Sequence, residues 1–314
     1  IFGAVHDISW LHNEKCPLSF HMGYTFHTNI TSGPEMLGEA DIALRQAKLG
    51  STSRWTKFAD VQNGDVPVLG KPLNEWEVFL HQAIQNRLVA LHYQPIVSIQ
   101  DKALMAQEVY VRFLNGKDLL AAAVVGPIAE RLGLMPGLDR LILESLASAE
   151  REKETPTKLC VNLSIVSVKT SGFLRWLDNF LASQRRLAAK LVFEVPEYAM
   201  KANGASLRTF SQLLQKHGTS LGIDHFGLES AAFGYLSSLP LNHLKVHRSF
   251  LRELDTNLDN QFYIKSLAGL AHNSGLQLWV EGVENEQEWD QLAELDADAA
   301  QGYFLGPPAL RTVD

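Results

Sequence analysis

The sequence predicts an α/β protein whose main part is a (β/α)8 TIM-like barrel, preceded by a short α+β segment. From about residue 91 onward, short apolar stretches alternate with segments of helical length, and about eight such units favour a parallel sheet that closes on itself. Each apolar stretch carries one or two polar residues, where barrels of this type build their sites. An open doubly wound sheet is the weaker alternative, because no glycine-rich phosphate loop follows the first strand.

Residues 1–60 do not resemble a complete domain. Alternating and apolar stretches predict strands at Ser19–His27 and Arg54–Phe58, and the apolar spacing of Pro34–Lys48 predicts an amphipathic helix. Residues 61–71 are rich in Gly and Pro and indicate a linker. A helix over Pro72–Asn86 then opens the third segment, residues 72–314, in which we expect the barrel.

The elements of the barrel follow from the alternation of apolar runs and helical spacing. Strands are expected at Leu91–Val97, Glu108–Arg112, Leu159–Ser164, Leu191–Glu197, Ser220–Phe226, His243–Ser249, Gln277–Glu284 and Ala299–Gly306. Helices are expected at Pro127–Leu132, Gly137–Ala149, Gly172–Gln184, Ser206–His217, Phe233–Ser238, Asn257–Asn273 and Asn285–Leu295.

The composition narrows the class of protein. The chain is 46% hydrophobic and 20% charged, and its net charge of −7 gives no reason to expect binding to a nucleic acid polymer. Cys16 and Cys160 lie far apart and form no disulfide framework or zinc spacing, which favours a reducing, cytoplasmic compartment. No apolar run is long enough to cross a bilayer. Because the chain begins at Ile1 in mid-pattern, we interpret it as a fragment, and a tether to the inner membrane outside it stays open.

Polar residues on separate predicted strands form one candidate site. The four all-oxygen members are Glu108, Asn162, Glu194 and Asp224. Carboxylates and an amide carbonyl suit a hard divalent ion such as Mg²⁺, Mn²⁺ or Ca²⁺, rather than a thiolate zinc site. Lys245 and Arg112 add the positive charge that a phosphate ligand requires. Any one of these residues alone is more often structural, and Lys245 alone is also explained as a partner of Glu281, so only the set is specific.

Seven motifs, in order and spacing, resemble those of EAL domains, the cyclic di-GMP phosphodiesterase family, from about Leu91 to Pro308. They are Tyr93-Gln94-Pro95, Glu108-Val109-Tyr110-Val111-Arg112, Val161-Asn162-Leu163-Ser164, Phe193-Glu194-Val195-Pro196-Glu197, Lys245, Glu281-Gly282-Val283-Glu284 and Gln301-Gly302-Tyr303. The resemblance implies a cyclic di-GMP site with Arg112 near a phosphate and Pro307 in the pocket wall. It implies that Gln94, Asp139 and Glu284 lie near guanine or ribose. It also places Glu108, Lys245 and Glu281 at catalytic positions, and Gln301 among the ligand-binding residues.

Two departures from the family pattern bear on catalysis. The family's paired Asp-Asp is here Asp224-His225, and its Lys-Ile-Asp is here Lys245-Val246-His247. The two replaced aspartates are the family's main ligands for a second metal ion. Hydrolysis in such sites uses two ions, roughly 3.5–4 Å apart. Two neutral imidazoles remove two negative charges from the second position, so a hard ion should bind there less tightly.

The two histidines leave two interpretations open. They form either an altered second site, since imidazole binds Mn²⁺, Fe²⁺ and Zn²⁺, or the remnant of a lost one, hydrogen-bonded to neighbouring carboxylates. The family's Thr-Gly-Tyr-Ser-Ser loop, which supports metal binding and dimerisation, is replaced by residues 228–232. This further departure, in the loop, favours loss of the second site.

The segment before the barrel carries a second resemblance. Gly38–Lys48, with Arg54 and Phe58, is similar to the C-terminal helix and last strand of a degenerate GGDEF domain. The nucleotide-binding half of that domain is not in the sequence, so no cyclase activity is expected.

The favoured hypothesis is a catalytically inactive EAL domain that acts as a bacterial cyclic di-GMP receptor in signal transduction, for example in biofilm control, with a protein partner or a homodimer as its output. The order of domains resembles membrane-anchored LapD-type receptors, although their name-giving motif is altered and Glu108 is retained here. Two alternatives stay open. One is a weak or metal-shifted phosphodiesterase that makes pGpG, and the other is a CsrD-type interaction module that binds no nucleotide.

Overall fold

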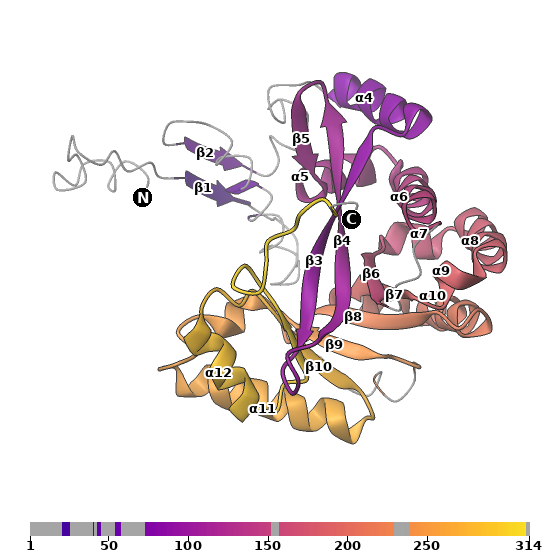
Figure 1. Ribbon diagram of the computed structural model, residues 1–314. Helices are drawn as coiled ribbons and strands as arrows, with labels where there is room; N and C mark the ends of the chain where they lie inside the picture. Colours follow the sequence, from indigo (N-terminus) through magenta and orange to yellow (C-terminus); the bar gives the residue numbers. More distant parts are fainter. Residues whose placement is uncertain are drawn as a thin grey trace. The chain divides into compact units, whose positions relative to one another are not determined.

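The chain is described by a computed structural model (Figure 1). The described residues are 21–25, 40, 43–44, 54–57, 73–151, 157–228, 236 and 239–311. Two compact units divide the chain after Leu80, which lies within helix α4 (Leu73–Asn86). The boundaries expected at residues 60 and 72 therefore stay a prediction.

The first unit contains two short strands. Strands β1 (His21–Tyr24) and β2 (Arg54–Lys57) pair in parallel, with His21 opposite Arg54. Both fall within the strands predicted from the sequence. The helix predicted over Pro34–Lys48 lies mainly outside the described residues.

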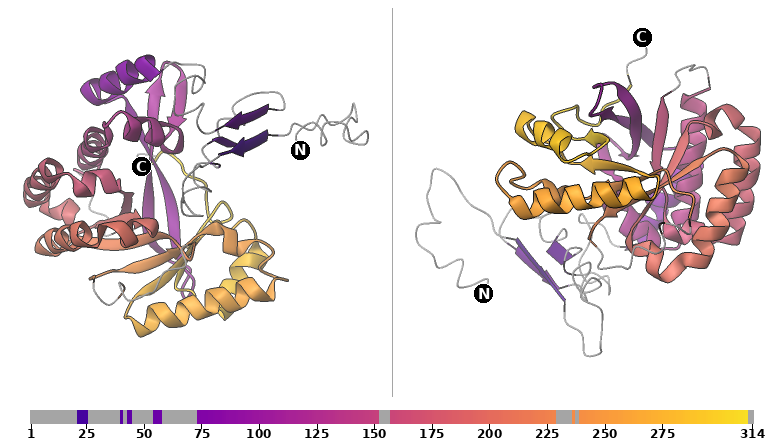
Figure 2. Two further views of the ribbon diagram at one scale, coloured as in Figure 1. Left: turned by 180° about the vertical axis from the view of Figure 1, so that it is seen from behind. Right: turned by 90° about the horizontal axis from the view of Figure 1, so that it is seen from below.

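Eight strands of the second unit close into a barrel (Figure 2), which confirms the predicted fold class. They are β3 (Val89–Ser98), β4 (Leu104–Asn115), β6 (Lys158–Asn162), β7 (Leu191–Pro196), β8 (Ser220–Phe226), β9 (His243–Val246), β10 (Gln277–Glu281) and β11 (Ala299–Gln301). Strands β4 and β6 to β11 pair in parallel in that order, and β3 pairs with both β4 and β11 to close the ring. The short strand β5 (Asp118–Ala121) extends the sheet beside β4.

Strand β3 departs from the parallel pattern, because it runs antiparallel to both of its neighbours. A tight turn joins it directly to β4, in which Lys102 takes a positive φ of 57° and the Ser98 amide donates to the carbonyl of Ala103. Its N-terminal half therefore lies beside the C-terminal half of β4. Gln94 is opposite Glu108, and Ala90 is opposite Arg112.

The helices of the second unit lie on the outside of the sheet (Figure 2). They are α5 (Ala122–Arg131), α6 (Met135–Ala149), α7 (Ile165–Lys169), α8 (Ser171–Ser183), α9 (Arg185–Ala188), α10 (Tyr198–Lys216), the 3-10 helix η3 (Arg248–Leu251), α11 (Leu258–Asn273) and α12 (Glu286–Glu294). Helix α10 begins eight residues before the predicted Ser206 and is kinked at Asn203. The helix predicted over Phe233–Ser238 lies almost wholly outside the described residues. Among the described helices, none combines the length and apolarity that a bilayer span requires.

Alternation along the strands divides their side chains between two environments. Outward-facing residues such as Phe193 pack against the helices, with the Phe193 and Phe210 rings 5.9 Å apart. Inward-facing residues build an apolar layer, which consists of Ile96, Ala106, Cys160, Val192, Trp279 and Ala299. Two positions further on each strand, toward the carboxyl ends of the parallel strands, the inward-facing residue is polar. The sheet thus carries a polar layer above an apolar one.

A substitution at Gly222 tests how tightly the barrel interior is packed at the level of the apolar layer. A Cβ at this position would meet the His243 ring, which stacks on Trp279 with 3.6 Å between ring centroids. We expect Gly222→Ala to lower the free energy of unfolding by about 1–3 kcal/mol, the usual cost of overpacking a core, as measured by urea denaturation. Gly269→Ala in helix α11, where a Cβ meets nothing within 4 Å, should be neutral or stabilising by about 0.5–1 kcal/mol. Equal losses in both variants would contradict this packing.

Candidate functional site

Polar side chains from all eight barrel strands form one layer at the mouth of the barrel. Its members are Gln94, Glu108, Asn162, Glu194, Asp224, Lys245, Glu281 and Gln301, all of them predicted site residues. The structure brings them together because each lies on the inward face of its strand, at or near the end where parallel strands leave the sheet. Their roles toward a ligand or metal stay predictions.

Lys245 joins two carboxylates at the centre of this layer. Its Nζ donates to Glu108 Oε2 at 2.9 Å and to Glu194 Oε2 at 2.5 Å, and all three side chains are buried. Asn162 Nδ2 donates to the other oxygen of Glu108 at 2.6 Å. Burial alone would lower the pKa of Lys245, but the neighbouring carboxylates raise it well above its usual value, so the amine is a cation. The buried carboxylates are therefore paired, as their desolvation requires.

His243 is a member of this network that the sequence analysis did not single out. Its Nε2 lies 2.8 Å from Glu194 Oε1, and the ring is fully buried. Burial and the charge of Lys245 lower the pKa of His243 well below its usual value, so the imidazole is neutral. Burial raises the pKa of Glu194 to about 7, although Lys245 opposes the shift. His243 lies two residues before Lys245 on the same strand, so the two side chains face the same way. This spacing was the signal that could have identified His243.

A second polar network links β3, β4 and β11. Gln301 Nε2 donates to Gln94 Oε1 at 2.8 Å and to the Tyr110 hydroxyl at 3.2 Å. Gln94 Nε2 in turn donates to the carbonyl of Gly306 at 2.9 Å. Tyr110, also missed by the sequence analysis, shares the inward face of β4 with Glu108 and Arg112, since the three alternate along one strand. Burial raises the pKa of Tyr110, so its hydroxyl keeps its proton.

Three of the predicted ligand-binding residues lie at the rim of the site. Arg112 is half-buried, with its guanidinium 5.9 Å from the centre of the Tyr110 ring and one nitrogen donating to the carbonyl of Val111. Glu284 and Pro307 are exposed. The structure therefore leaves these two side chains outside the buried network.

Asp139 lies on helix α6 rather than on a strand. It is buried, and it accepts hydrogen bonds from Ser167 Oγ at 2.5 Å and from the Ser164 amide at 3.3 Å. Burial raises the pKa of Asp139 to about 7, despite these two donors. The hydrogen bond from the Ser164 amide connects Asp139 to the segment that follows β6, just after Asn162.

The two histidines that replace aspartates meet Glu281 at the ends of β8, β9 and β10. His225 Nε2 and His247 Nε2 lie 3.9 Å and 4.0 Å from Glu281 Oε1, and the two rings are 5.3 Å apart. Within the described residues, this is the group of three His, Cys, Asp or Glu side chains whose ligand atoms all lie within 4.8 Å of one another. Burial and the Asp224 carboxylate raise the pKa of Glu281 to about 7, and burial and His225 lower that of His247 to about 4.

The donor sets for two metal ions differ in chemistry. The set predicted for a first ion is made of oxygen atoms and suits Mg²⁺ or Mn²⁺. A cation there would compete with Lys245, which already contacts Glu108 and Glu194. The second position offers two imidazoles and one carboxylate, which do not fit a hard ion and suit a transition metal.

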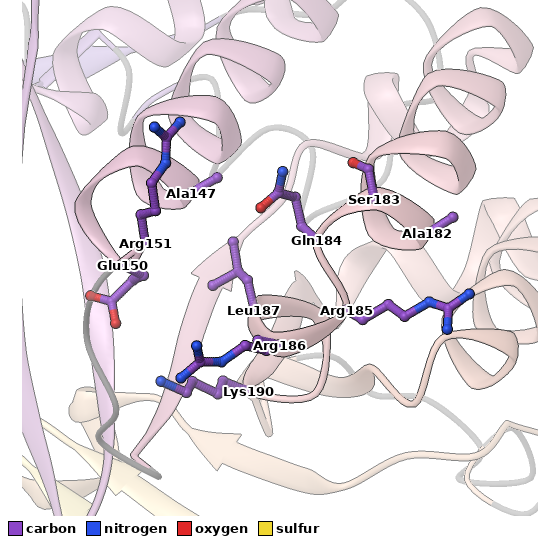
Figure 3. A pocket seen from close by; sticks show the side chains of 10 residues that line it. All are labelled: Ala147, Glu150, Arg151, Ala182, Ser183, Gln184, Arg185, Arg186, Leu187 and Lys190. Carbon is purple, nitrogen blue, oxygen red and sulfur yellow. The ribbon is translucent and has the colours of Figure 1, made fainter.

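A pocket of about 360 Å³ lies away from this site (Figure 3). Its lining comes from the segments that lead into β6 and β7, so it lies at the amino ends of the strands. Arg151, Arg185, Arg186 and Lys190 surround it. The charged ends of Arg151 and Arg185 point apart in Figure 3, so they do not converge on one ligand.

The comparison with known proteins identifies the class. Residues 78–308 match the EAL domain, and the chain belongs to this family. It is 28% identical over 280 residues to the bifunctional diguanylate cyclase/cyclic di-GMP phosphodiesterase MucR of Pseudomonas aeruginosa, an alignment that covers 87% of this chain and 40% of MucR. The chain thus spans well under two thirds of that relative.

Two solved structures are similar in fold. The EAL domain of FimX from Pseudomonas aeruginosa, bound to c-di-GMP, has a TM-score of 0.70 and 27% identity, and the match covers 76% of this chain and 97% of that one. The S helix-GGDEF-EAL portion of LapD from Vibrio cholerae, in its apo form, has a TM-score of 0.72 and 21% identity, with 90% and 68% coverage. The second likeness shows the fold alone.

Lys245→Met should destabilise the fold strongly, because it leaves two buried carboxylates without their cation. We expect the free energy of unfolding to fall by about 3–5 kcal/mol in urea denaturation. Lys216→Met removes an exposed pair with Asp178 and should cost less than about 1 kcal/mol. A loss for Lys245→Met no larger than that of the surface control would show that the central pair does not hold the layer together.

Asp139 predicts a specific pH dependence of stability. Its pKa rises from 3.8 to about 7 on folding, so the folded state holds an extra proton between these values. This contribution to stability is complete below the unfolded pKa and is lost as pH rises through the folded one. Asp139→Asn should therefore reduce the fall in unfolding free energy between about pH 5 and about pH 8 by a few kcal/mol, since one pKa unit corresponds to about 1.4 kcal/mol. An unchanged slope in parallel urea titrations would refute the shift.

Proposed function

We propose that this chain binds cyclic di-GMP at the mouth of its barrel and acts as a receptor without hydrolysing it. The observation that carries the proposal is the contrast between the two sides of the site. The positions expected to face the nucleotide keep their polar residues and their mutual hydrogen bonds, whereas the second-metal position carries His225 and His247. The solved complex of the FimX EAL domain with c-di-GMP, at 27% identity, supports this ligand.

The chemistry of binding follows from charge and hydrogen bonding. Arg112, half-buried at the rim, would hold a phosphate through charge-assisted hydrogen bonds, which are the stronger kind. Gln94 and Gln301 are fixed by each other and by Tyr110, so they would present a pre-ordered amide surface to a base or ribose. Glu284, Asp139 and Pro307 complete the expected set.

The absence of hydrolysis rests on the metal ligands. A two-metal site activates water and steadies the leaving oxygen when both ions are bound. Here the second position offers two imidazoles and the single Glu281 carboxylate, where the family pattern has two further aspartates. A Mg²⁺ ion would find little negative charge there.

The signalling role extends beyond the barrel. We propose that residues 1–60 are the C-terminal piece of a degenerate GGDEF domain, and that the chain is the cytoplasmic part of an inner-membrane receptor of the LapD type. The similarity in fold to the S helix-GGDEF-EAL portion of LapD, over 90% of this chain, supports this domain order. A protein partner or a second copy would receive the signal.

A metal-shifted phosphodiesterase is the second candidate function. The convergence of His225, His247 and Glu281 within 4.8 Å favours it over the CsrD-type module, because a transition metal at this position would restore a second ion. The phosphodiesterase would convert cyclic di-GMP to pGpG, whereas the receptor would leave the nucleotide intact.

Calorimetric titration with cyclic di-GMP in Mn²⁺, followed by chromatography of the cell contents, tests the proposal. We expect micromolar or tighter binding and intact nucleotide. Arg112→Ala should weaken binding roughly 10–100-fold, the equivalent of losing a charge-assisted hydrogen bond. Arg185→Ala, at the opposite end of the barrel, is the matched control and should leave affinity unchanged.

The remaining outcomes decide against the receptor. Formation of pGpG that is lost on Glu108→Ala would establish the phosphodiesterase. If the folded chain does not bind cyclic di-GMP, the CsrD-type interaction module is the remaining hypothesis.

A further inference from the structure

We propose that Arg311 is a positioning residue for the nucleotide site, because it holds residues 306–311 against the edge of strand β3. These residues are called the C-terminal strap below. The proposal rests on the binding of cyclic di-GMP proposed above, and it gives a role to a side chain that is not expected to touch the nucleotide.

The C-terminal strap lies on a part of β3 that β11 does not cover. Strand β11 pairs with β3 only over Ile96–Ser98. Further toward the mouth, the Tyr93 amide donates to the Ala309 carbonyl at 2.7 Å, and the Ala309 amide donates to the Tyr93 carbonyl at 3.1 Å. This pairing is an isolated bridge and not a strand. Two hydrogen bonds contribute little against the backbone entropy of an extended segment, so the strap depends on further contacts.

Arg311 supplies these contacts. Its guanidinium donates through Nη1 to Glu150 and through Nη2 to Gln107, and it lies 4.1 Å from the centre of the Tyr93 ring. Both Glu150 and Arg311 are largely buried, and charge-assisted hydrogen bonds from a planar guanidinium are of the stronger kind. One side chain therefore connects the strap to β3, to β4 and to the end of helix α6.

The other end of the C-terminal strap meets the candidate site. The Gly306 carbonyl accepts the hydrogen bond from Gln94 Nε2 at 2.9 Å. Gly306 has a φ of 143°, and a Cβ there would come within 3.1 Å of the Pro95 ring, so glycine lets the backbone approach β3 this closely. Pro307, expected in the pocket wall, lies between this contact and the Ala309 bridge. Its position at the rim depends on both.

Detachment of the C-terminal strap would change the ligand side of the barrel. It would release the Gly306 carbonyl from Gln94 and free Pro307 to move. The apparent affinity for the nucleotide then falls with the fraction of molecules whose strap is attached. Because coupling between two sites is reciprocal, a nucleotide that prefers the attached strap must also stabilise it. A purely structural role of Arg311 predicts no such effect of the nucleotide.

Calorimetry and residue-resolved hydrogen exchange of the purified chain test the proposal. Arg311→Met should weaken binding of cyclic di-GMP by roughly 5–150-fold, the usual range of a coupling between two sites. It should also speed exchange of the Tyr93 amide, whose acceptor lies in the strap, and saturating nucleotide should slow this exchange again. Arg311→Lys keeps the charge without the planar fork, so both effects should be intermediate.

Two further variants guard against trivial results. Ala309→Pro removes the amide that donates to Tyr93 and leaves no charge unpaired, so it tests the strap even if Arg311→Met does not fold. It should also weaken binding and speed exchange of the Tyr93 amide. Asp178→Asn removes an ion pair with Lys216 between helices α8 and α10, and it should change neither quantity.

Three results would overturn the role of Arg311. They are wild-type affinity in variants whose Tyr93 amide exchanges faster, an unchanged exchange rate in Arg311→Met, and exchange of the Tyr93 amide that does not respond to nucleotide. If the wild-type chain binds no nucleotide, the proposed function fails and this role fails with it. The affinity of the wild-type chain thus separates the two failures.

Discussion

The polar layer of this barrel depends on the ammonium group of Lys245. Four strands converge on it, because β4 and β7 bring Glu108 and Glu194 to the Lys245 amine, while Asn162 binds Glu108 from β6. Without that cation, two carboxylates would face each other in a water-poor interior, at a cost of several kcal/mol each, order of magnitude. Because the apolar layer beneath excludes water, the two carboxylates depend on their pairing with Lys245.

The sequence predicted the barrel because apolar runs of strand length and helical spacing are local signals. It did not predict the direction of β3, since an apolar run carries no direction and the tight turn before β4 was not recognised. The sequence analysis placed the ends of two strands too late, because each strand stops at a glycine. Strand β10 ends before Gly282, which has a φ of 93°. Strand β11 ends before Gly302, where a Cβ would meet the backbone of Val283.

The sequence predicted some residues of the site and missed others. Its charged members stood out because a carboxylate in an apolar strand is unusual. Tyr110 and His243 were missed, since an aromatic ring in such a strand has the profile of an ordinary core residue. Their partners, such as Glu194 for His243, lie 49 residues away along the chain. Only the closed barrel brings these residues together, and no local pattern specifies that contact.

The antiparallel direction of β3 has a mechanical consequence. In a wholly parallel barrel the polypeptide enters at the base, far from the ligand side. Here the first strand starts at the mouth, where Ala90 pairs with Arg112 of β4, whereas its pairing with β11 covers only Ile96–Ser98. Because Ala90 pairs with Arg112, we expect a displacement of the chain just ahead of Val89 to shift the rim of the site through this pairing.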